Sequence, residues 1–155
     1  MDAGVRSSVT VDRDGAVAWV RYASDLDRLD ALGLLALRRA LDGLTADPTV
    51  RVIVFGGLPG RYPILMDPDE GRAIAALAPA LPAWLTVGGV RVALALLRRF
   101  RGLRRLLDAP RWARRTALLN LVLATDALEA PGIVSVAAID GPAFGGGMEL
   151  ALACD

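Results

Sequence analysis

Two short runs of apolar residues, far apart in the sequence, constrain the fold of this chain most. Residues 51–55 (RVIVF) and 133–139 (IVSVAAI) are each the length of one strand and are bounded by glycine, proline or aspartate. Because neither run alternates apolar with polar residues, each is typical of a strand that is buried on both faces of a parallel sheet. With helical segments between them, the two runs predict an α/β fold in which they pair as parallel strands.

A β-hairpin is predicted ahead of the first run. Residues 9–11 (VTV) and 17–20 (VAWV) are short runs of strand-forming residues. Asp14-Gly15 lies between them and is a strong signal for a two-residue hairpin turn.

Residues 33–44 predict an amphipathic helix. Leucines recur there at spacings of three and four, which places one apolar stripe along the helix. Asp30 is the expected N-cap, and Asp47-Pro48 ends the helical region. The polar residues expected to face outward are Arg38, Arg39 and Asp42.

Residues 73–128 are helical in composition but interrupted by prolines and glycines. Their first part, 73–90, is uncharged over 18 residues, close to the length of a membrane span, but four helix breakers argue against one. The next part, 91–107, has an apolar stripe at Val92, Leu96, Phe100, Leu103 and Leu107, with arginines beside it. Two interpretations stay open: a solvated amphipathic helix, or a face that contacts anions or a membrane surface.

Several classes of site are excluded by composition. The chain has no histidine and no lysine, which excludes Ser-His-Asp triads, histidine metal sites and P-loops. The 18 arginines nearly balance the 17 acidic residues, so a general nucleic-acid binder is not expected. Cys154 is the single cysteine, and the N-terminal residues lack the apolar stretch of a secretory signal. We therefore expect a cytoplasmic protein without a metal site.

The second apolar run leads directly into the segment that carries chemistry. After Asp140-Gly141-Pro142, three glycines at 145–147 open a predicted helix that starts near residue 146. The first N–H groups of a helix lack internal partners and lie at the positive end of its dipole, so they favour an oxygen with negative charge. Glu149 follows closely, either to complement that dipole or to act as an acid/base group. The spacing does not fit a dinucleotide-binding fingerprint.

The segment IVSVAAIDGPAFGGGMELALACD (133–155) strongly resembles the signature segment of the crotonase superfamily, the enoyl-CoA hydratase/isomerase family. Four upstream segments follow in that family's order: VTVDRDGAVAWVRY, RLDALGLLALRRALDGL, DPTVRVIVFGG and RYPILMDPDE. The resemblance therefore covers 9–70 and 131–155. It implies a partial ClpP/crotonase-like spiral fold with an enlarged helical middle at 73–128. Residues 1–155 are then expected to form a single domain that resembles the N-terminal half of a family member, apparently truncated at its C-terminus.

The resemblance also implies a site for acyl-CoA, without a cofactor. Gly146 matches one backbone donor of the family's oxyanion hole, Ile64 matches the other, and Glu149 matches an acid/base carboxylate. A shift of one residue would make Leu65 the second donor. The chain has Leu65 where the family usually has glycine, and Tyr62-Pro63 where it usually has phenylalanine and a small residue. The substrate-binding residues implied are Ile64, Leu65, Met66, Asp67, Gly145 and Gly146.

Three hypotheses about function follow. The chain belongs to an active hydratase (a lyase) or isomerase of fatty acid metabolism, as a truncated form or completed by a partner chain or a further copy. Alternatively, it is a crotonase-like chain that binds acyl-CoA or another protein without catalysis. In the third, the Arg-rich middle makes it a membrane-peripheral protein, although a membrane partner is the less expected outcome.

Overall fold

A four-stranded sheet forms the base of the fold. The structure is a computed structural model that describes residues 7–66, 94–97, 99–104 and 109–155, with single positions at 68, 72, 89 and 92. The strands are β1 (Ser7–Asp14), β2 (Val17–Ser24), β4 (Val52–Gly56) and β6 (Val134–Ala138), in the order β1-β2-β4-β6. The hairpin pair β1·β2 is antiparallel, whereas β2·β4 and β4·β6 are parallel. The predicted α/β fold, with the two apolar runs as neighbouring parallel strands, is confirmed.

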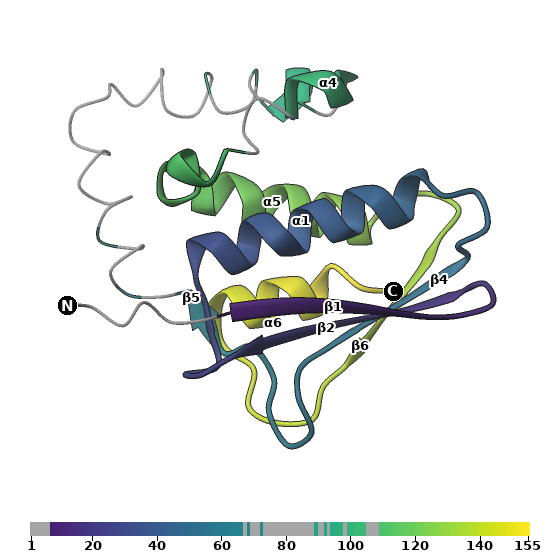
Figure 1. Cartoon of the computed structure of the whole chain (residues 1–155), viewed down its shortest axis with the longest axis vertical. Coiled ribbons are helices and arrows are strands. Elements are labelled where there is room, and N and C mark those ends of the chain that lie inside the picture. Colours follow the sequence, from purple (N-terminus) through teal and green to yellow (C-terminus); the bar gives the residue numbers. More distant parts are fainter. Residues whose placement is uncertain are drawn as a thin grey trace.

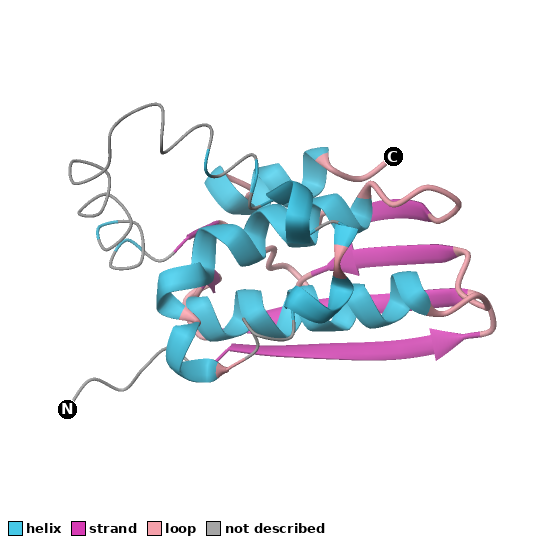
Figure 2. Cartoon of the chain, turned by 90° about the horizontal axis from the view of Figure 1, so that it is seen from above, coloured by secondary structure: helices cyan, strands magenta, loops and turns pink. Residues whose placement is uncertain are grey.

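The helices lie on one face of this sheet (Figures 1 and 2). They are α1 (Ala31–Ala46), α5 (Ala117–Leu128) and α6 (Gly145–Leu152), and the short α4 (Arg101–Arg104) lies beyond α1, away from the sheet (Figure 1). Two 3₁₀ turns, η3 (Pro110–Trp112) and η4 (Arg114–Thr116), lead into α5. A second, small sheet pairs β3 (Arg28–Leu29) with β5 (Leu65–Met66) in parallel.

The hairpin is longer than predicted and turns one residue later. Asp14 pairs with Val17, so the two loop residues are Gly15 and Ala16 rather than Asp14 and Gly15. Gly15 has a φ of 57°, whereas Ala16 does not have a positive φ. A glycine with positive φ at the first loop position fits a type II′ turn, which suits the twist of a hairpin.

Helix α1 is two residues longer at each end than the predicted 33–44, and the predicted N-cap at Asp30 and end at Asp47 are confirmed. The Asp30 side chain accepts a hydrogen bond from the Gly33 N–H at 2.9 Å, and Asp47 follows the last turn. The prediction that Arg38 faces outward is wrong, because its side chain is only 2% exposed. The Arg38 Nε donates to Asn120 Oδ1 of α5 at 2.9 Å. Helix α1 is therefore covered by α5 on the side of Arg38, in addition to the side that packs against the sheet.

Strand β6 corrects the prediction that residues 133–139 are buried on both faces. Ser135 is buried, whereas Val134, Val136 and Ala138 are exposed. The helices that the structure describes cover one face of the sheet only, and β6 is an edge strand of the described sheet, so its residues on the other face are exposed. By contrast, Ile53 to Gly56 in β4 are all buried, as predicted for a central strand.

The middle of the chain is described only in part. Residues 73–88, 90 and 91 lie outside the described residues, and within the described part no helix is long and apolar enough to cross a membrane. Of the predicted apolar stripe, Val92, Leu96 and Phe100 are exposed. Leu97, which is not part of that stripe, is buried. Leu107 and the side chain of Leu103 lie outside the described part.

Candidate functional site

The loop that follows β4 and the start of α6 meet at the candidate site. The backbone N–H groups of Phe144 and Gly147 both donate to the Ile64 carbonyl oxygen, at 3.2 and 3.3 Å. These bonds bring Ile64 close to Gly146, which lies 82 positions later in the sequence. The two residues are those that the resemblance implies as the two oxyanion donors.

The close approach of these two segments explains the glycines. A Cβ on Gly147 would overlap the carbonyl oxygen of Pro63, and a Cβ on Gly146 would lie 2.9 Å from Leu29 Cδ1. Both residues are buried. Glycine lets another group come close to the backbone, and the group that approaches Gly147 is the chain's own backbone at Pro63 and Ile64.

Two N–H groups at the start of α6 have no acceptor among the described residues. They belong to Gly145, which is exposed, and to Gly146, whereas the next two, on Gly147 and Met148, donate to the Phe144 carbonyl at 3.0 and 3.3 Å. Both unpaired donors lie at the positive end of the helix dipole. This end of α6 is therefore suited to stabilise an oxygen that carries negative charge.

The second predicted donor is already occupied in this structure. The Ile64 N–H donates to the Asp27 carbonyl oxygen at 2.7 Å. Asp27 has a φ of 52°, and its carboxylate accepts from Arg61 Nε at 2.8 Å, which holds this turn in place. Ile64 can donate to a ligand only if the turn at Asp27 moves away. Leu65, the alternative donor, lies in β5, where it pairs with Arg28.

Glu149 is the fifth residue of α6, beyond its first turn, so it is poorly placed to complement the helix dipole. It is exposed, and its carboxylate has no hydrogen bond or ion pair with any described residue. Residues four apart lie on the same side of a helix, so Glu149 shares a side with Gly145. Of its two sequence interpretations, the acid/base group fits this position better.

The other predicted substrate-binding residues differ in what the structure describes. Met66 is half-buried and packs against the hydrophobic core. Leu65 is described by its backbone only, and Asp67 lies outside the described residues.

Two further titratable side chains, Tyr62 and Cys154, were not among the predicted site residues, and they interact with each other. Tyr62 is buried, its ring packs edge-on against Phe55 at 5.8 Å, and its hydroxyl has no partner among the described residues. Burial raises the pKa of the Tyr62 phenol and of the Cys154 thiol. Because both groups stay protonated near neutral pH, neither offers a ready nucleophile.

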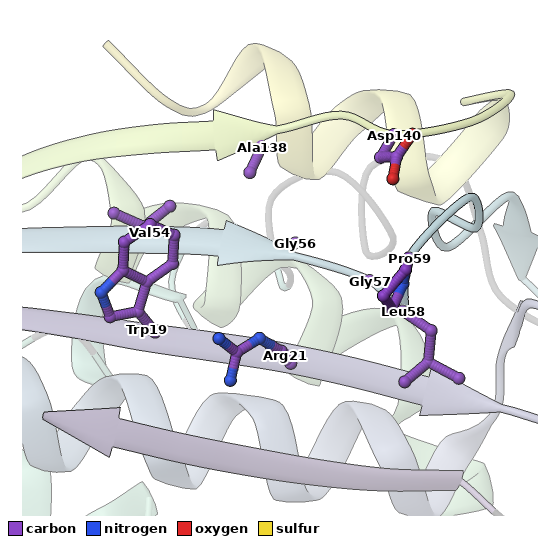
Figure 3. Close-up of a pocket in the computed structure, with 9 residues that line it drawn as sticks. All are labelled: Trp19, Arg21, Val54, Gly56, Gly57, Leu58, Pro59, Ala138 and Asp140. Carbon is purple, nitrogen blue, oxygen red and sulfur yellow. The ribbon is translucent and has the colours of Figure 1, made fainter.

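A shallow pocket of about 190 Å³ lies on the face of the sheet opposite the described helices (Figure 3). Trp19 and Arg21 of β2 line it, with the Arg21 guanidinium 5.9 Å from the Trp19 ring centre. Asp140 closes its end, and one carboxylate oxygen accepts from the Gly60 N–H at 2.7 Å. Neither Gly146 nor Glu149 lines this pocket, so it is separate from the candidate site. Among the described residues, no cluster of carboxylate and thiol groups could hold a metal ion.

Comparisons with known proteins find similarity in structure only. No protein-family profile matches the sequence, and no curated protein matches it significantly. Among solved structures, an enoyl-CoA hydratase/carnithine racemase from Magnetospirillum magneticum is similar with a TM-score of 0.64 and 22% identity over 95% of this chain. An enoyl-CoA hydratase from Bacillus anthracis is similar with a TM-score of 0.60 and 19% identity over 95% of this chain. DspI from Pseudomonas aeruginosa is similar with a TM-score of 0.59 and 23% identity over 95% of this chain.

The chain spans about half the length of the solved structures it matches. It covers 44% of the Magnetospirillum protein, 45% of the Bacillus protein and 44% of DspI. At these levels of identity, the similarity shows the fold.

Proposed function

Because the chain has, in part, the crotonase-type fold of enoyl-CoA hydratases, we propose that it contributes to a site for acyl-CoA thioesters. In this proposal the start of α6 stabilises negative charge on the thioester oxygen. Glu149 moves the proton at the carbon next to the thioester. The single cysteine, with no disulfide, suits the reducing cytoplasm in which we place the reaction.

The observation that supports this proposal most is the pair of unpaired N–H groups at Gly145 and Gly146. Removing a proton from the α-carbon of a thioester transfers charge to the carbonyl oxygen, so fixed donors aimed at that oxygen lower the barrier. The loss of one such donor typically costs on the order of 10²–10³ in rate. Gly146 would supply one donor, and Ile64, or Leu65 in the shifted register, the second.

The chain's own residues favour proton transfer over water addition. Glu149 is the only acidic residue of α6, and a single carboxylate can move a proton between two carbons, as double-bond isomerisation requires. Hydration asks for more, since a water must be activated and the α-carbon must be protonated. We therefore propose isomerisation as the reaction that Glu149 best supports.

The experiment is exchange of the α-protons of butyryl-CoA in D₂O, followed by NMR, together with 3-enoyl-CoA isomerisation. Glu149→Gln is expected to slow both by about 10²–10⁴, the usual contribution of general acid–base catalysis, with acyl-CoA binding unchanged. The matched control is Glu129→Gln, at an exposed position that follows α5. Equal rates for wild type and Glu149→Gln would remove Glu149 from the mechanism.

A non-catalytic acyl-CoA-binding role is the second candidate, and one observation favours it. The Ile64 N–H already donates to Asp27, so in this conformation the site offers donors from α6 only. A protein of this kind would bind butyryl-CoA in a calorimetric titration but would leave its α-protons unexchanged.

A further inference from the structure

The apolar stripe in the middle of the chain faces solvent. Val92, Leu96 and Phe100 are spaced four residues apart and are 61%, 44% and 57% exposed. Leu97, beside them in the sequence, is 5% exposed and is the residue that packs inward. An amphipathic helix that covers a protein core buries its apolar stripe, whereas this segment presents the stripe outward.

The charge of the chain is concentrated directly after this stripe. Residues 98–115 contain eight of the 18 arginines but only one of the 17 acidic residues, Asp108. This stretch therefore carries a formal charge of +7, and the rest of the chain carries −6. A local excess of this size attracts anionic surfaces even though the whole chain is nearly neutral.

Trp112 lies within this basic stretch and is exposed on the turn η3. The guanidinium of Arg115 lies 5.2 Å from its ring centre and that of Arg111 lies 5.9 Å away. Neither arginine has a carboxylate partner among the described residues. Tryptophan and arginine side chains of this kind are typical of the boundary between lipid headgroups and acyl chains.

A partly buried polar network holds the segment that carries the stripe. Arg104 donates to the Leu97 carbonyl oxygen at 2.7 Å and pairs with Asp42 of α1. Asp42 also accepts from the buried Arg38 at 2.8 Å. The segment is thereby attached to α1 through Leu97 and Arg104, on the side of the helices away from the sheet (Figure 1), which leaves Leu96 and Phe100 pointing outward.

We propose that the exposed residues Val92, Leu96 and Phe100, together with Trp112 and its neighbours Arg111 and Arg115, dock on an anionic lipid bilayer. Exposed apolar side chains followed in the sequence by a basic stretch with an exposed tryptophan are the features of an interfacial membrane-binding segment. A second copy of the chain fits these residues poorly, because a symmetric contact would bring the exposed Arg111 and Arg115 of one copy against those of the other. Single-stranded nucleic acid would leave Val92 and Leu96 exposed. The proposal does not depend on the acyl-CoA site.

The experiment is flotation of the whole chain with vesicles of 70% phosphatidylcholine and 30% phosphatidylglycerol, compared with pure phosphatidylcholine. We expect binding to the anionic vesicles only, weakened by added salt. Leu96→Glu is expected to weaken binding at least ten-fold, because the bilayer would no longer bury this leucine. Arg115→Gln is expected to weaken binding about five-fold, because one charge facing the lipid headgroups is lost. Matched controls are Leu26→Glu, at a turn residue that is 53% exposed, and Arg51→Gln, at an exposed arginine of another loop. Both should bind like wild type.

Four outcomes would overturn the proposal. The first is no flotation with anionic vesicles, and the second is equal weakening by Leu26→Glu and Leu96→Glu when circular dichroism shows both variants folded. Binding of a single-stranded oligonucleotide that displaces the vesicles, and that Leu96→Glu does not change, would assign the surface to nucleic acid. Self-association in the absence of vesicles that Leu96→Glu abolishes would assign it to a second copy.

Discussion

Gly147 is the residue at which the space between the candidate site's two segments is smallest. Gly147→Ala would place a methyl group on the Pro63 carbonyl oxygen, and backbone cannot yield as a flexible side chain can. We expect this variant to lose about 1–3 kcal/mol or more of unfolding free energy, the usual cost of overpacking. Urea denaturation measures it.

Gly43 in α1 is the matched control for this substitution. A Cβ there would meet no atom within 4 Å, and Gly43 has no positive φ. Gly43→Ala is therefore expected to stabilise the chain by about 0.5–1 kcal/mol, because alanine favours the helix. A Gly147→Ala variant as stable as wild type would contradict the contact between α6 and the backbone at Pro63, in the loop before β5.

Asp47 gives the chain a defined pH dependence at residue scale. Its carboxylate accepts from the hydroxyl and the N–H of Thr49 and from Arg13, and these bonds lower the pKa of Asp47 to about 2. A lowered folded-state pKa contributes stability above the unfolded value, and this contribution is lost as the pH falls through the folded value. Asp47→Asn is thus expected to be less stable than wild type at pH 7, with the difference vanishing between about pH 4 and 2. Thermal unfolding across this range tests it, and a constant difference down to pH 2 would contradict it.

At the scale of elements, the contact between α1 and α5 contains a buried arginine. Arg38 bonds to Asn120, which is fully buried, and to Asp42. Arg38→Ala would leave the buried Asn120 Oδ1 without its donor and Asp42 with Arg104 as its remaining partner, and we expect a loss of about 3–5 kcal/mol in urea denaturation. The double variant Arg38→Met/Asn120→Leu should recover much of it, since apolar residues of similar volume often replace a buried polar pair at little cost. Equal losses in both variants would show that packing, rather than the unpaired groups, sets the cost.

Strand β6 differs from β4 in a way that stability measurements can detect. Val136 points to the uncovered face of the sheet, whereas Ile53 of β4 points into the core. Val136→Thr is expected to change the unfolding free energy by less than about 0.5 kcal/mol, and Ile53→Thr to cost at least about 2 kcal/mol. Equal costs would mean that both faces of β6 are covered in solution.

The elements of the fold could largely be predicted from the sequence, because their signals are local. The leucine spacing, the cap at Asp30 and the two apolar runs all gave the observed type of element. The two wrong predictions, an exposed Arg38 and a buried Val136, have the same cause. The burial of these side chains does not depend on the local sequence pattern. Each depends on whether another element, α5 or a second layer, lies against that side.

For the molecule as a whole, the predicted partial crotonase fold is confirmed by the solved structures. The candidate site could be predicted less fully. Gly146 and Gly147 carry a signal in the sequence, because a position where a Cβ would clash with a neighbouring segment is occupied by glycine. The pairing of the Ile64 N–H with Asp27 carries none, because it depends on how a turn some 37 residues earlier folds against the loop.

The parallel pair β4·β6 has a consequence for how the molecule folds. Val52 pairs with Val134, 82 positions later, whereas the hairpin β1·β2 closes across two residues. The entropy of closing a loop grows only with the logarithm of its length, by about 0.6 kcal/mol for each doubling, so the segment between β4 and β6 can lengthen at little cost in stability. The rate is more sensitive, because pairings between distant residues slow the search for the native topology. The hairpin and α1 can therefore assemble early, and the docking of β6 with α6, which completes the candidate site, comes late on the folding pathway.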